Sequence, residues 1–404
     1  MSECPIFHYP SDAPRSLELD PVLTAVQEAG GVAKLRLPHG NPCWVVTGWS
    51  DTRTVYSSKA FTRVGMADEA APRLTAGLLL AGAIGGQDDA VHLKLRRAIQ
   101  RELTPERLAL LRTRADAIMI ELLDAMIVSG GGDYVSMVAK PFAVRVLCEL
   151  LGVPDADREQ LVAWVSALLT GAAEGTDPEA IGIAAKDAGK YIVAMIRERR
   201  RTPGSDLVSA FATRADELDT RELATIVFAL VMGGFETTAH MLSKLVLRLL
   251  QRPDLWHTLC ERPELLPSAT EELLRITAIA GGEAIPWQVR EEVTLAGVTM
   301  VPGEYVLPAV GAANFDPTAF PNAEEILLDR NGKTHLTFGH ATHFCIGSQI
   351  ARMELEVGLG ALLRTCPRTN LAIAPEEVTW RSMSAVWELA ELPLKLTRAE
   401  EPAV

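Results

Sequence analysis

Apolar and polar positions follow two different periods along this chain. From about 91 to 250, apolar residues recur three and four positions apart, as on one face of an amphipathic helix. Two short apolar runs, 32–37 and 44–47, flank a segment rich in proline, glycine and asparagine, which predicts a β-hairpin. Strand-like patterns return at 293–301. The chain is therefore predicted to be mainly α with minor β.

The longest predicted helix has the clearest boundaries. Asp219 and Glu222 form a capping-box pattern at its start, and apolar periodicity continues to Leu250, after which a proline stops it. About thirty helical residues span roughly 45 Å, enough to cross a whole domain. A shorter helix is expected to follow, with a second capping-box pattern at Ser268 and Glu271.

Nothing in the sequence divides the 404 residues into separate units. The chain contains no Ser/Gly linker, low-complexity tract or internal repeat, and 48% of its residues are hydrophobic. We expect one domain over 1–404. Its small β-rich part is expected mainly at about 30–60 and 290–310, and its helical part at about 90–280 and 348–365.

Charge and composition narrow the functional classes. The net charge of −13 argues against nucleic acid as a partner, because nucleic acids select for basic surfaces. No uninterrupted apolar run approaches the roughly 18 to 20 residues that a membrane span requires. The first residues lack the pattern of a secretory signal, and the cysteines lack paired metal-ligand spacing. We expect a cytoplasmic protein with reduced thiols, and no membrane partner.

A cysteine-containing loop is the first candidate for chemistry. Residues 338–347 read Phe-Gly-His-Ala-Thr-His-Phe-Cys-Ile-Gly, and an amphipathic stretch begins at about Ser348. Cys345 would then lie at a helix N-terminus, where the helix dipole and free backbone N–H groups favour the thiolate. A thiolate binds iron and donates electron density to it. The alternative is a buried structural cysteine.

The second candidate lies midway along the long helix. Gly233 and Gly234 each cost about 1 kcal/mol relative to alanine inside a helix. That cost indicates that something flat or bulky packs against the backbone there. Glu236 and Thr237 follow directly, and an acid beside a hydroxyl can relay protons or hold a water. The alternative is a helix crossing that requires small residues.

Two weaker patterns complete the set. Glu272 and Arg275 lie at i, i+3 on one helix face, a commonplace pairing that contributes a few tenths of a kcal/mol when exposed. His92 and Arg96 lie at i, i+4 and place two potential cations on one face, suited to carboxylate or propionate groups. Taken alone, each also fits an ordinary solvated helix.

Together and in this order, the four patterns resemble the cytochrome P450 family over nearly the whole chain. The family's haem loop, Phe-Gly-x-Gly-x-His-x-Cys-x-Gly, matches 338–347 except that Ala341 replaces the second glycine. The helix motif Ala/Gly-Gly-x-Asp/Glu-Thr matches 233–237, and Glu-x-x-Arg matches 272–275. The stretch 314–330 resembles the family's meander segment.

The resemblance implies the single-domain cytochrome P450 fold, with haem b between the long central helix and the Cys-ligand loop. Cys345 would be the axial iron ligand, donating electron density that favours O–O cleavage. Dioxygen would be the co-substrate, and electrons would come ultimately from NAD(P)H through ferredoxin reductase and ferredoxin. Glu236 and Thr237 would deliver protons to the bound oxygen.

The resemblance also assigns the surroundings of the cofactor. The residues placed beside the haem or its propionates are Phe338, Gly234, Gly339, Gly347, His92, Arg96 and His343. Glu272, Arg275 and Arg330 would form a buried network that holds the haem-loop side of the fold, which requires every charge to be satisfied.

Two positions depart from the family pattern. If the position of Ala341 requires a positive φ, alanine adds strain there. Trp287 stands where most soluble members carry an arginine for a propionate. Its indole N–H could donate to that propionate. Alternatively, the ring fills the gap and another residue or water takes the propionate.

The expected substrate is uncharged, largely flat and of moderate size. By family position, its walls are apolar and include Met66, Leu230, Phe235, Ile279, Ile285, Trp287, Val386 and Trp387. The segments 271–276, 311–317 and 343–345 also resemble the branch whose mycobacterial member couples the tyrosyl rings of a cyclic dipeptide, although this chain keeps Glu236 and Thr237. An aromatic, tryptophan-containing cyclic dipeptide from a natural-product pathway is the predicted substrate.

Three functions are compatible with these residues. The leading one is a monooxygenase that inserts oxygen into an unactivated C–H bond. The second is oxidative C–C or C–N coupling of aromatic cyclic dipeptides without oxygen insertion. The third, a non-catalytic haem sensor or carrier, is disfavoured by Glu236 and Thr237. Lys94, Arg97 and Arg101 form a basic stripe that either docks an acidic ferredoxin or is a plain solvated helix face.

Overall fold

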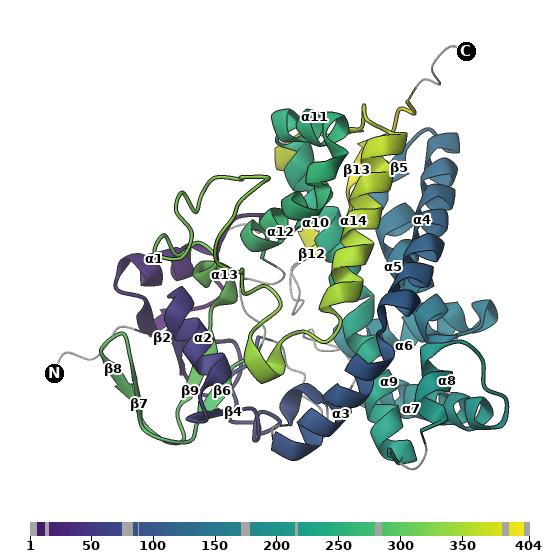
Figure 1. The fold of residues 1–404 in the computed structure, drawn as a ribbon. Coiled ribbons are helices and arrows are strands. Elements are labelled where there is room, and N and C mark those ends of the chain that lie inside the picture. Colours follow the sequence, from purple (N-terminus) through teal and green to yellow (C-terminus); the bar gives the residue numbers. More distant parts are fainter. Residues whose placement is uncertain are drawn as a thin grey trace.

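In the computed structural model, most of the helices lie on one side of the molecule, and the largest sheet lies on the other side with a few short helices (Figure 1). The structure describes residues 6–12, 16–74, 84–87, 89–170, 178–214, 217–278, 285–381 and 388–399. Within these residues the chain is mainly helical with minor sheet, as the hydrophobic periodicity predicts.

The helices follow the amphipathic pattern read from the sequence. In chain order they are α1 (Pro21–Glu28), α2 (Trp49–Ser57), α3 (Asp89–Glu102), α4 (Pro105–Val128), α5 (Lys140–Leu151), α6 (Arg158–Thr170), α7 (Pro178–Arg201), α8 (Leu207–Ala212), α9 (Thr220–Gly234), α10 (Glu236–Leu250), α11 (Pro253–Glu261), α12 (Leu266–Ile276), α13 (Val310–Ala313) and α14 (Ser348–Thr365). A π-helical turn, Val135–Ala139, precedes α5.

The largest sheet has six strands in the order β1-β2-β3-β9-β6-β4. These strands are β1 (Ile6–His8), β2 (Val32–Arg36), β3 (Cys43–Val46), β9 (Tyr305–Pro308), β6 (Trp287–Val289) and β4 (Phe61–Thr62). β2 and β3 pair antiparallel, with Val32 opposite Val46, which confirms the predicted hairpin. β7 (Val293–Leu295) and β8 (Val298–Met300) form a second hairpin, where the sequence indicated a single strand-like stretch.

Four short strands near the C-terminus were not predicted from the sequence pattern. β13 (Pro393–Lys395) pairs with β10 (Asn370–Leu371) on one side and with β5 (Gly132–Asp133) on the other, and β11 (Trp380–Arg381) pairs with β12 (Glu388–Leu389). Each has only two or three residues, too few to display a period of two. β12 lies beside α10 and therefore brings the C-terminal segment to the long helix.

The predicted long helix covers the expected span but is interrupted at one residue. α9 begins with the predicted capping box, in which both Asp219–Glu222 hydrogen bonds form. The backbone departs from helical geometry at Phe235 (φ −115°, ψ −46°). The hydroxyls of Thr237 and Thr238 donate to the carbonyls of Gly233 and Gly234, at 2.7 and 3.4 Å, and so satisfy acceptors freed by the bend.

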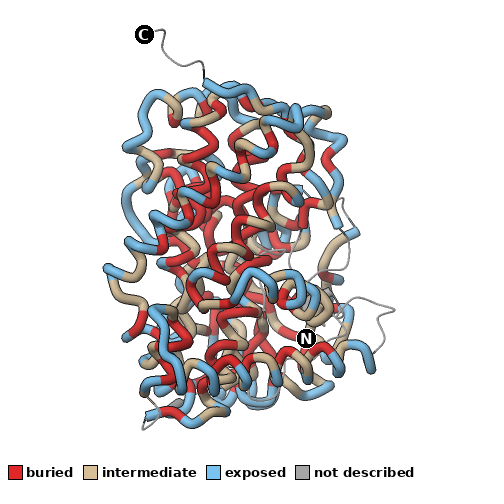
Figure 2. Tube along the Cα trace, turned by 90° about the vertical axis from the view of Figure 1, so that its right-hand side faces the viewer, coloured by how far each residue is buried: buried red, intermediate tan, exposed pale blue. Residues whose placement is uncertain are grey.

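The long helix forms the centre of the helical core. α10 packs against α5 and α14, and α14 packs against α4, so buried residues form a continuous interior (Figure 2). The span Thr220–Leu250 is long and apolar enough to cross a membrane, with a mean hydropathy of 1.3 in its most apolar window. Because 61% of that window is buried inside the structure, this span is the core helix of the fold.

The second predicted capping box is wrong. α12 begins at Leu266, with a proline in its first turn, and Leu265 makes no side-chain cap. The Ser268 hydroxyl instead donates to the Leu265 carbonyl at 2.9 Å. Glu271 points to other partners, as described below.

Candidate haem site

The loop before α14 presents Cys345 through two left-handed residues. Gly339 has φ 73° and Ala341 has φ 50°. The position of Ala341 therefore does require a positive φ, and alanine adds strain there. The Cys345 amide donates to the Phe338 carbonyl at 2.7 Å, which closes the loop. A Cβ on Gly339 would lie 3.1 Å from the His343 carbonyl oxygen and from the Tyr56 ring, so this position favours glycine.

The Cys345 thiol faces an internal cavity. The side chain is exposed, but the surface it exposes borders that cavity. Burial raises the pKa of the Cys345 thiol, while the Gly347 amide and the guanidinium groups of Arg96 and Arg352 act in the opposite direction. Arg96 also donates a hydrogen bond to the Phe344 carbonyl. The thiol is therefore held in a dry, cation-flanked position suited to a metal ligand.

The cavity lies between the long helix and the cysteine loop. It has a volume of about 290 Å³. Most of its walls are apolar, and its lining residues are Leu147, Leu150, Ala229, Leu230, Gly233, Gly234, Thr237, Thr238, Met241, Leu274, Thr337, Phe338, Cys345, Ile346, Gly347, Ile350, Ala351, Glu354 and Leu355. An apolar wall opposite a single thiol fits a flat ring whose metal the thiol ligates.

The two glycines of the long helix have different surroundings. A Cβ on Gly234 would come within 2.9 Å of Leu147 Cδ1, so α5 packs against the backbone there. A Cβ on Gly233 would meet nothing within 4 Å, and this residue borders the cavity. The close approach inferred from the sequence therefore occurs at Gly234, whereas Gly233 leaves room beside the cavity.

The predicted acid–alcohol pair divides between two environments. Thr237 borders the cavity, but Glu236 is absent from its lining and is 4% exposed. The Ser166 hydroxyl lies 3.5 Å from the Glu236 carboxylate. Burial and the neighbouring Glu388 carboxylate raise the pKa of Glu236 to about 7. At neutral pH Glu236 thus has an acidity suited to giving and taking protons.

Glu354, on α14, is a cavity residue that the sequence motifs did not indicate. It is 2% exposed, and its carboxyl lies at hydrogen-bonding distance of Thr238. Burial raises the pKa of Glu354 to about 8, and the Thr238 hydroxyl opposes this only in part. The carboxyl therefore tends to stay neutral inside an apolar cavity, which avoids the large cost of a buried charge.

Cations and aromatic rings gather at the opening between α3, the cysteine loop and β6. His92 stacks on His343, with ring centroids 4.3 Å apart, and His343 and Trp287 form a T-shaped pair with ring centroids 4.9 Å apart. The Arg63 guanidinium lies over the Trp287 ring, 4.3 Å from its centroid, in a cation–π contact. We call His92, His343, Trp287 and Arg63 the aromatic–cationic stack. Arg63, on the chain after β4, was not predicted as a site residue.

Trp287 carries an unsatisfied donor in this stack. The side chain is 3% exposed, and its indole Nε1 has no hydrogen-bond partner among the described residues. A buried donor without an acceptor costs about 1–3 kcal/mol. An anionic group such as a propionate at this place would accept from it. The residues present thus fit a haem: the thiol would hold its iron, and the stack would hold its carboxylates.

The structure brings Glu272, Arg275 and Arg330 together. Arg275 donates to both Glu272 oxygens at 2.8 Å, and Arg330 Nε lies 2.9 Å from each of them. Burial would raise the pKa of Glu272, but hydrogen bonds from Arg275, the Leu327 amide and Arg330 outweigh it and lower the pKa. Arg275 also donates to the carbonyls of Asn314 and Ala323, so α12 is tied to the segment before the cysteine loop.

The predicted substrate walls are only partly brought to the cavity. Among the described candidates, Leu230 borders it. Met66 is buried in the sheet core and Phe235 in the helical core, so neither placement supports a wall role at this cavity. Trp287 belongs to the aromatic–cationic stack, and Ile285 is half-buried just before β6. Ile279, Val386 and Trp387 lie outside the described residues.

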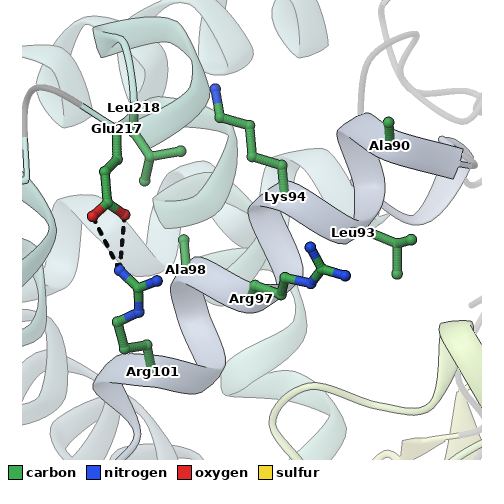
Figure 3. Close-up of a pocket in the computed structure, with 8 residues that line it drawn as sticks. All are labelled: Ala90, Leu93, Lys94, Arg97, Ala98, Arg101, Glu217 and Leu218. Carbon is green, nitrogen blue, oxygen red and sulfur yellow. Dashed lines mark hydrogen bonds and ion pairs between the residues drawn. The ribbon is translucent and has the colours of Figure 1, made fainter.

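The basic stripe on α3 is largely paired with acids. Lys94 Nζ lies 2.6 Å from Glu222, and Arg101 lies 2.8 Å from Glu217, the pair drawn in Figure 3. Arg97 is exposed and has no ion-pair partner among the described residues. The stripe lines a shallow surface cavity of about 340 Å³ together with Ala90, Leu93, Ala98 and Leu218 (Figure 3).

Comparison with known proteins places this site in a class of haem-thiolate oxidoreductases. A sequence model of the family described as Cytochrome P450 matches residues 260–378. Over 390 residues the chain is 38% identical to the mycinamicin IV hydroxylase/epoxidase of Micromonospora griseorubida, and the match covers 96% of this chain and 98% of that protein. It is 35% identical to the nocardicin C N-oxygenase of Nocardia uniformis subsp. tsuyamanensis, with the same two coverages.

A solved structure agrees with the sequence comparison. The fold matches cytochrome P450mel 107F1, described as having biaryl coupling reactivity, with a TM-score of 0.91 and 33% identity over 97% of this chain and 100% of that one. The chain belongs to the cytochrome P450 family. It is thus an enzyme of the oxidoreductase type. The family uses cysteine-ligated haem, dioxygen and electrons from NAD(P)H delivered through redox partners.

Proposed function

We propose that this enzyme is a monooxygenase that oxidises a small, largely apolar natural-product intermediate, with Cys345 as the iron ligand. The single observation that carries the proposal is that Cys345 and Thr237 border the same apolar cavity, on opposite elements. The relatives named above act on natural-product intermediates, according to their names. These two facts join a site for haem-thiolate chemistry to a class of substrate.

Each part of the site has a role in this proposal. When bound, the haem supplies the iron at which dioxygen is activated. Phe338, Gly234, Gly339 and Gly347 shape the cavity and the loop around it, while His92, Arg96 and His343 would hold the propionates. Trp287 would also donate its indole N–H to a propionate, and Arg63 would add positive charge beside the ring.

Proton delivery is assigned to Thr237 and Glu236. The Thr237 hydroxyl lies at the cavity wall and passes protons inward, and it is positioned by its hydrogen bond to the Gly233 carbonyl. Glu236 restores the proton that this hydroxyl gives up. The buried network of Glu272, Arg275 and Arg330 contributes no proton; it holds the segment that leads into the cysteine loop.

The nature of the product distinguishes two reactions. Oxygen insertion is favoured by the relatives named as a hydroxylase/epoxidase and an N-oxygenase. Oxidative coupling without oxygen insertion is favoured by the solved structure with biaryl coupling reactivity. Turnover under labelled dioxygen decides between them, because mass analysis shows one labelled oxygen atom in an insertion product and none in a coupled product. A sensor or carrier would give no product with any substrate.

The substrate is tested with a panel of ligands. The aromatic cyclic dipeptide inferred from the sequence stays a prediction, and the relatives named above do not support it. Purified holoenzyme is titrated with mycinamicin IV, nocardicin C and tryptophan-containing cyclic dipeptides, and the haem absorption band is followed. A saturable shift with one class, followed by its conversion, identifies the substrate class. A shift with none of them overturns all three choices.

The electron donor is proposed to be a ferredoxin, supplied by its reductase in the cytoplasm. Arg97 is the cation of the α3 stripe that offers an unpaired charge to an acidic partner. Arg97→Glu should weaken ferredoxin binding about fivefold at low salt, with a smaller effect at high salt because exposed charges are screened. Arg262→Glu, at a similarly exposed arginine directly after α11, is the matched control. Equal effects of both variants would contradict docking at α3.

A further inference from the structure

A row of ionisable side chains that do not line the cavity runs along α10. Glu236, His240 and Lys244 lie at i, i+4 and i+8, and so share one helix face. Glu388 approaches them from β12. The exposed fractions are 4% for Glu236, 0% for His240 and 2% each for Lys244 and Glu388. Four groups that prefer water are thus buried in one place.

These groups lie close enough to exchange protons. His240 Nε2 is 3.4 Å from the nearer Glu388 oxygen. One ligand atom from each of Glu236, His240 and Glu388 lies within 4.8 Å of the other two. A small rotation or one intervening water bridges such a gap. Neither ring nitrogen of His240 makes a hydrogen bond within the described structure, so both stay available.

The row reaches solvent at one end. Arg381 Nε lies 4.0 Å from the Glu388 carboxylate, and the Arg381 side chain is 53% exposed. At the other end, Glu236 immediately precedes Thr237, whose hydroxyl borders the cavity. The cluster therefore spans the distance from the surface at β11 to the cavity wall at α10.

Stability alone does not account for this cluster. Replacing a buried ion pair by well-packed apolar residues is often neutral or stabilising, because the charges lose their hydration. A metal ion is also disfavoured, although two carboxylates and an imidazole are possible ligands. Lys244 and Arg381 already supply positive charge beside Glu388. A divalent cation would add to that charge rather than balance it.

We propose that His240 and Glu388 form a proton inlet, through which Glu236 regains protons from solvent at Arg381. Each cycle moves one proton. Glu236 gives its proton towards Thr237 and becomes a carboxylate, then takes the proton from one nitrogen of His240. Glu388, a carboxylate at rest, takes up a proton from water at the Arg381 end and passes it to the other nitrogen of His240. His240 thus changes tautomer while staying neutral, and Glu388 is again a carboxylate.

The charged groups around the inlet favour this direction of transfer. On α10 these are Lys244, which donates to the Ala278 carbonyl at 2.9 Å, and Arg248 beyond it. Lys140 faces Glu236 and His240 from the start of α5, and Arg381 faces them from β11. Within the part of the chain that the structure describes, the acids of the inlet are Glu236 and Glu388, and Glu18 pairs with the more distant Arg248. Burial and these cations lower the pKa of His240 to about 3, so its ring is neutral and can accept and donate at once.

The inlet rests on the proposed function, because it supplies protons to the reaction assigned to Glu236 and Thr237. The test uses Glu388→Gln in the holoenzyme, with ferredoxin, reductase and the substrate identified by the ligand panel. Gln keeps the shape of the side chain but has no proton to relay. Product formation should fall about tenfold, less than the hundredfold or more that follows loss of a general acid itself.

Four further readouts distinguish a relay from a structural role. The spectral affinity for substrate should stay unchanged, the solvent deuterium isotope effect on turnover should increase, and Glu388→Asp should recover part of the rate. The protonated Glu236 carboxyl has an infrared band that can be identified because Glu236→Gln lacks it. In the resting enzyme, this band should titrate at lower pH in Glu388→Gln than in wild type. The cause is the loss of the Glu388 charge that favours the neutral acid.

The outcomes separate the inlet from the proposed function. If Glu236→Gln uncouples oxygen consumption from product while Glu388→Gln behaves as wild type, the inlet is wrong and the proposed function stands. If Glu236→Gln also behaves as wild type, the role of Glu236 fails, and the inlet fails with it. Should Glu388→Gln not fold because Lys244 loses its counter-charge, Glu388→Gln/Lys244→Met restores neutrality and must show the same loss of rate.

Discussion

Ala341 offers a direct test of backbone strain in the cysteine loop. Its φ of 50° lies in the left-handed region, which costs an L-residue with a Cβ about 1–2 kcal/mol. Ala341→Gly removes that cost. Glycine also gives the unfolded chain more freedom, which destabilises the fold by about 0.4–1 kcal/mol. Because Ala341 is exposed and its methyl group packs little, the two effects leave a net gain of about 1 kcal/mol.

The expected gain is small for a chain of this size. With an unfolding entropy of about 2.1 cal/mol/K per residue, 1 kcal/mol over 404 residues raises the midpoint of thermal unfolding by about 1 °C. Ala341→Val should act in the opposite direction, since a β-branched residue tolerates a positive φ worse than alanine. The ranking Gly, Ala, Val in falling stability is therefore the result to measure.

A matched control separates strain from effects on the haem. Ala296 is also exposed and has φ 43°, but it lies in the turn between β7 and β8. Ala296→Gly should give a similar gain in stability without involving the cysteine loop. Denaturant unfolding of both glycine variants, compared with wild type, provides the free energies. A clear loss of stability in Ala341→Gly alone would refute the strain argument, because it would mean that the methyl group is needed.

Three other substitutions probe the interior. Arg275→Met leaves the buried Glu272 charge without its bidentate partner and should lower the free energy of unfolding by about 3–5 kcal/mol. Arg262→Met, at an exposed pair, should change the free energy of unfolding by less than about 0.5 kcal/mol. Equal effects of the two variants in denaturant melts would contradict the burial argument. Thr237→Ala should divert electrons to hydrogen peroxide, measured against NAD(P)H consumed and product formed, and intact coupling would exclude its proton role. Glu354→Gln tests pH linkage: the pKa of Glu354 is raised to about 8, so the stabilisation from its neutral form is full below about pH 4.5 and is lost as the pH rises to 8. Relative to wild type, the variant should therefore gain stability between pH 5 and pH 8 in urea melts, and a constant difference would show that the carboxyl is not held neutral.

The parts of the site that lie within one short sequence motif could be predicted from the sequence. The cysteine loop and the glycine pair each lie within one short motif, so residue order alone points to Cys345, Gly234 and Thr237. For Ala341 the sequence supported only a conditional expectation of strain, and the positive φ itself comes from the structure. The fold class followed from the helical period, which persists over more than a hundred residues.

The parts of the site that the sequence did not predict depend on contacts between segments that are far apart in the chain. Arg63 meets Trp287, and His240 meets Glu388, across separations of more than 140 residues, and no motif includes these pairs. The break at Phe235 was not visible because threonine hydroxyls, rather than a proline, satisfy the freed carbonyls. The false capping box at Ser268 shows the reverse case, in which a local pattern yields to tertiary contacts. There Glu271 binds Arg352 at 2.6 Å instead of the helix start.

The identity of the iron ligand is the central claim, and the reduced carbon monoxide difference spectrum tests it most directly. Wild-type protein should show the thiolate-type band, and Cys260→Ser, a half-buried cysteine on α11, should keep it. Cys345→Ser should lose that band while circular dichroism shows a folded chain. An unchanged thiolate-type band in Cys345→Ser would contradict the account, because another residue would then have to ligate the iron.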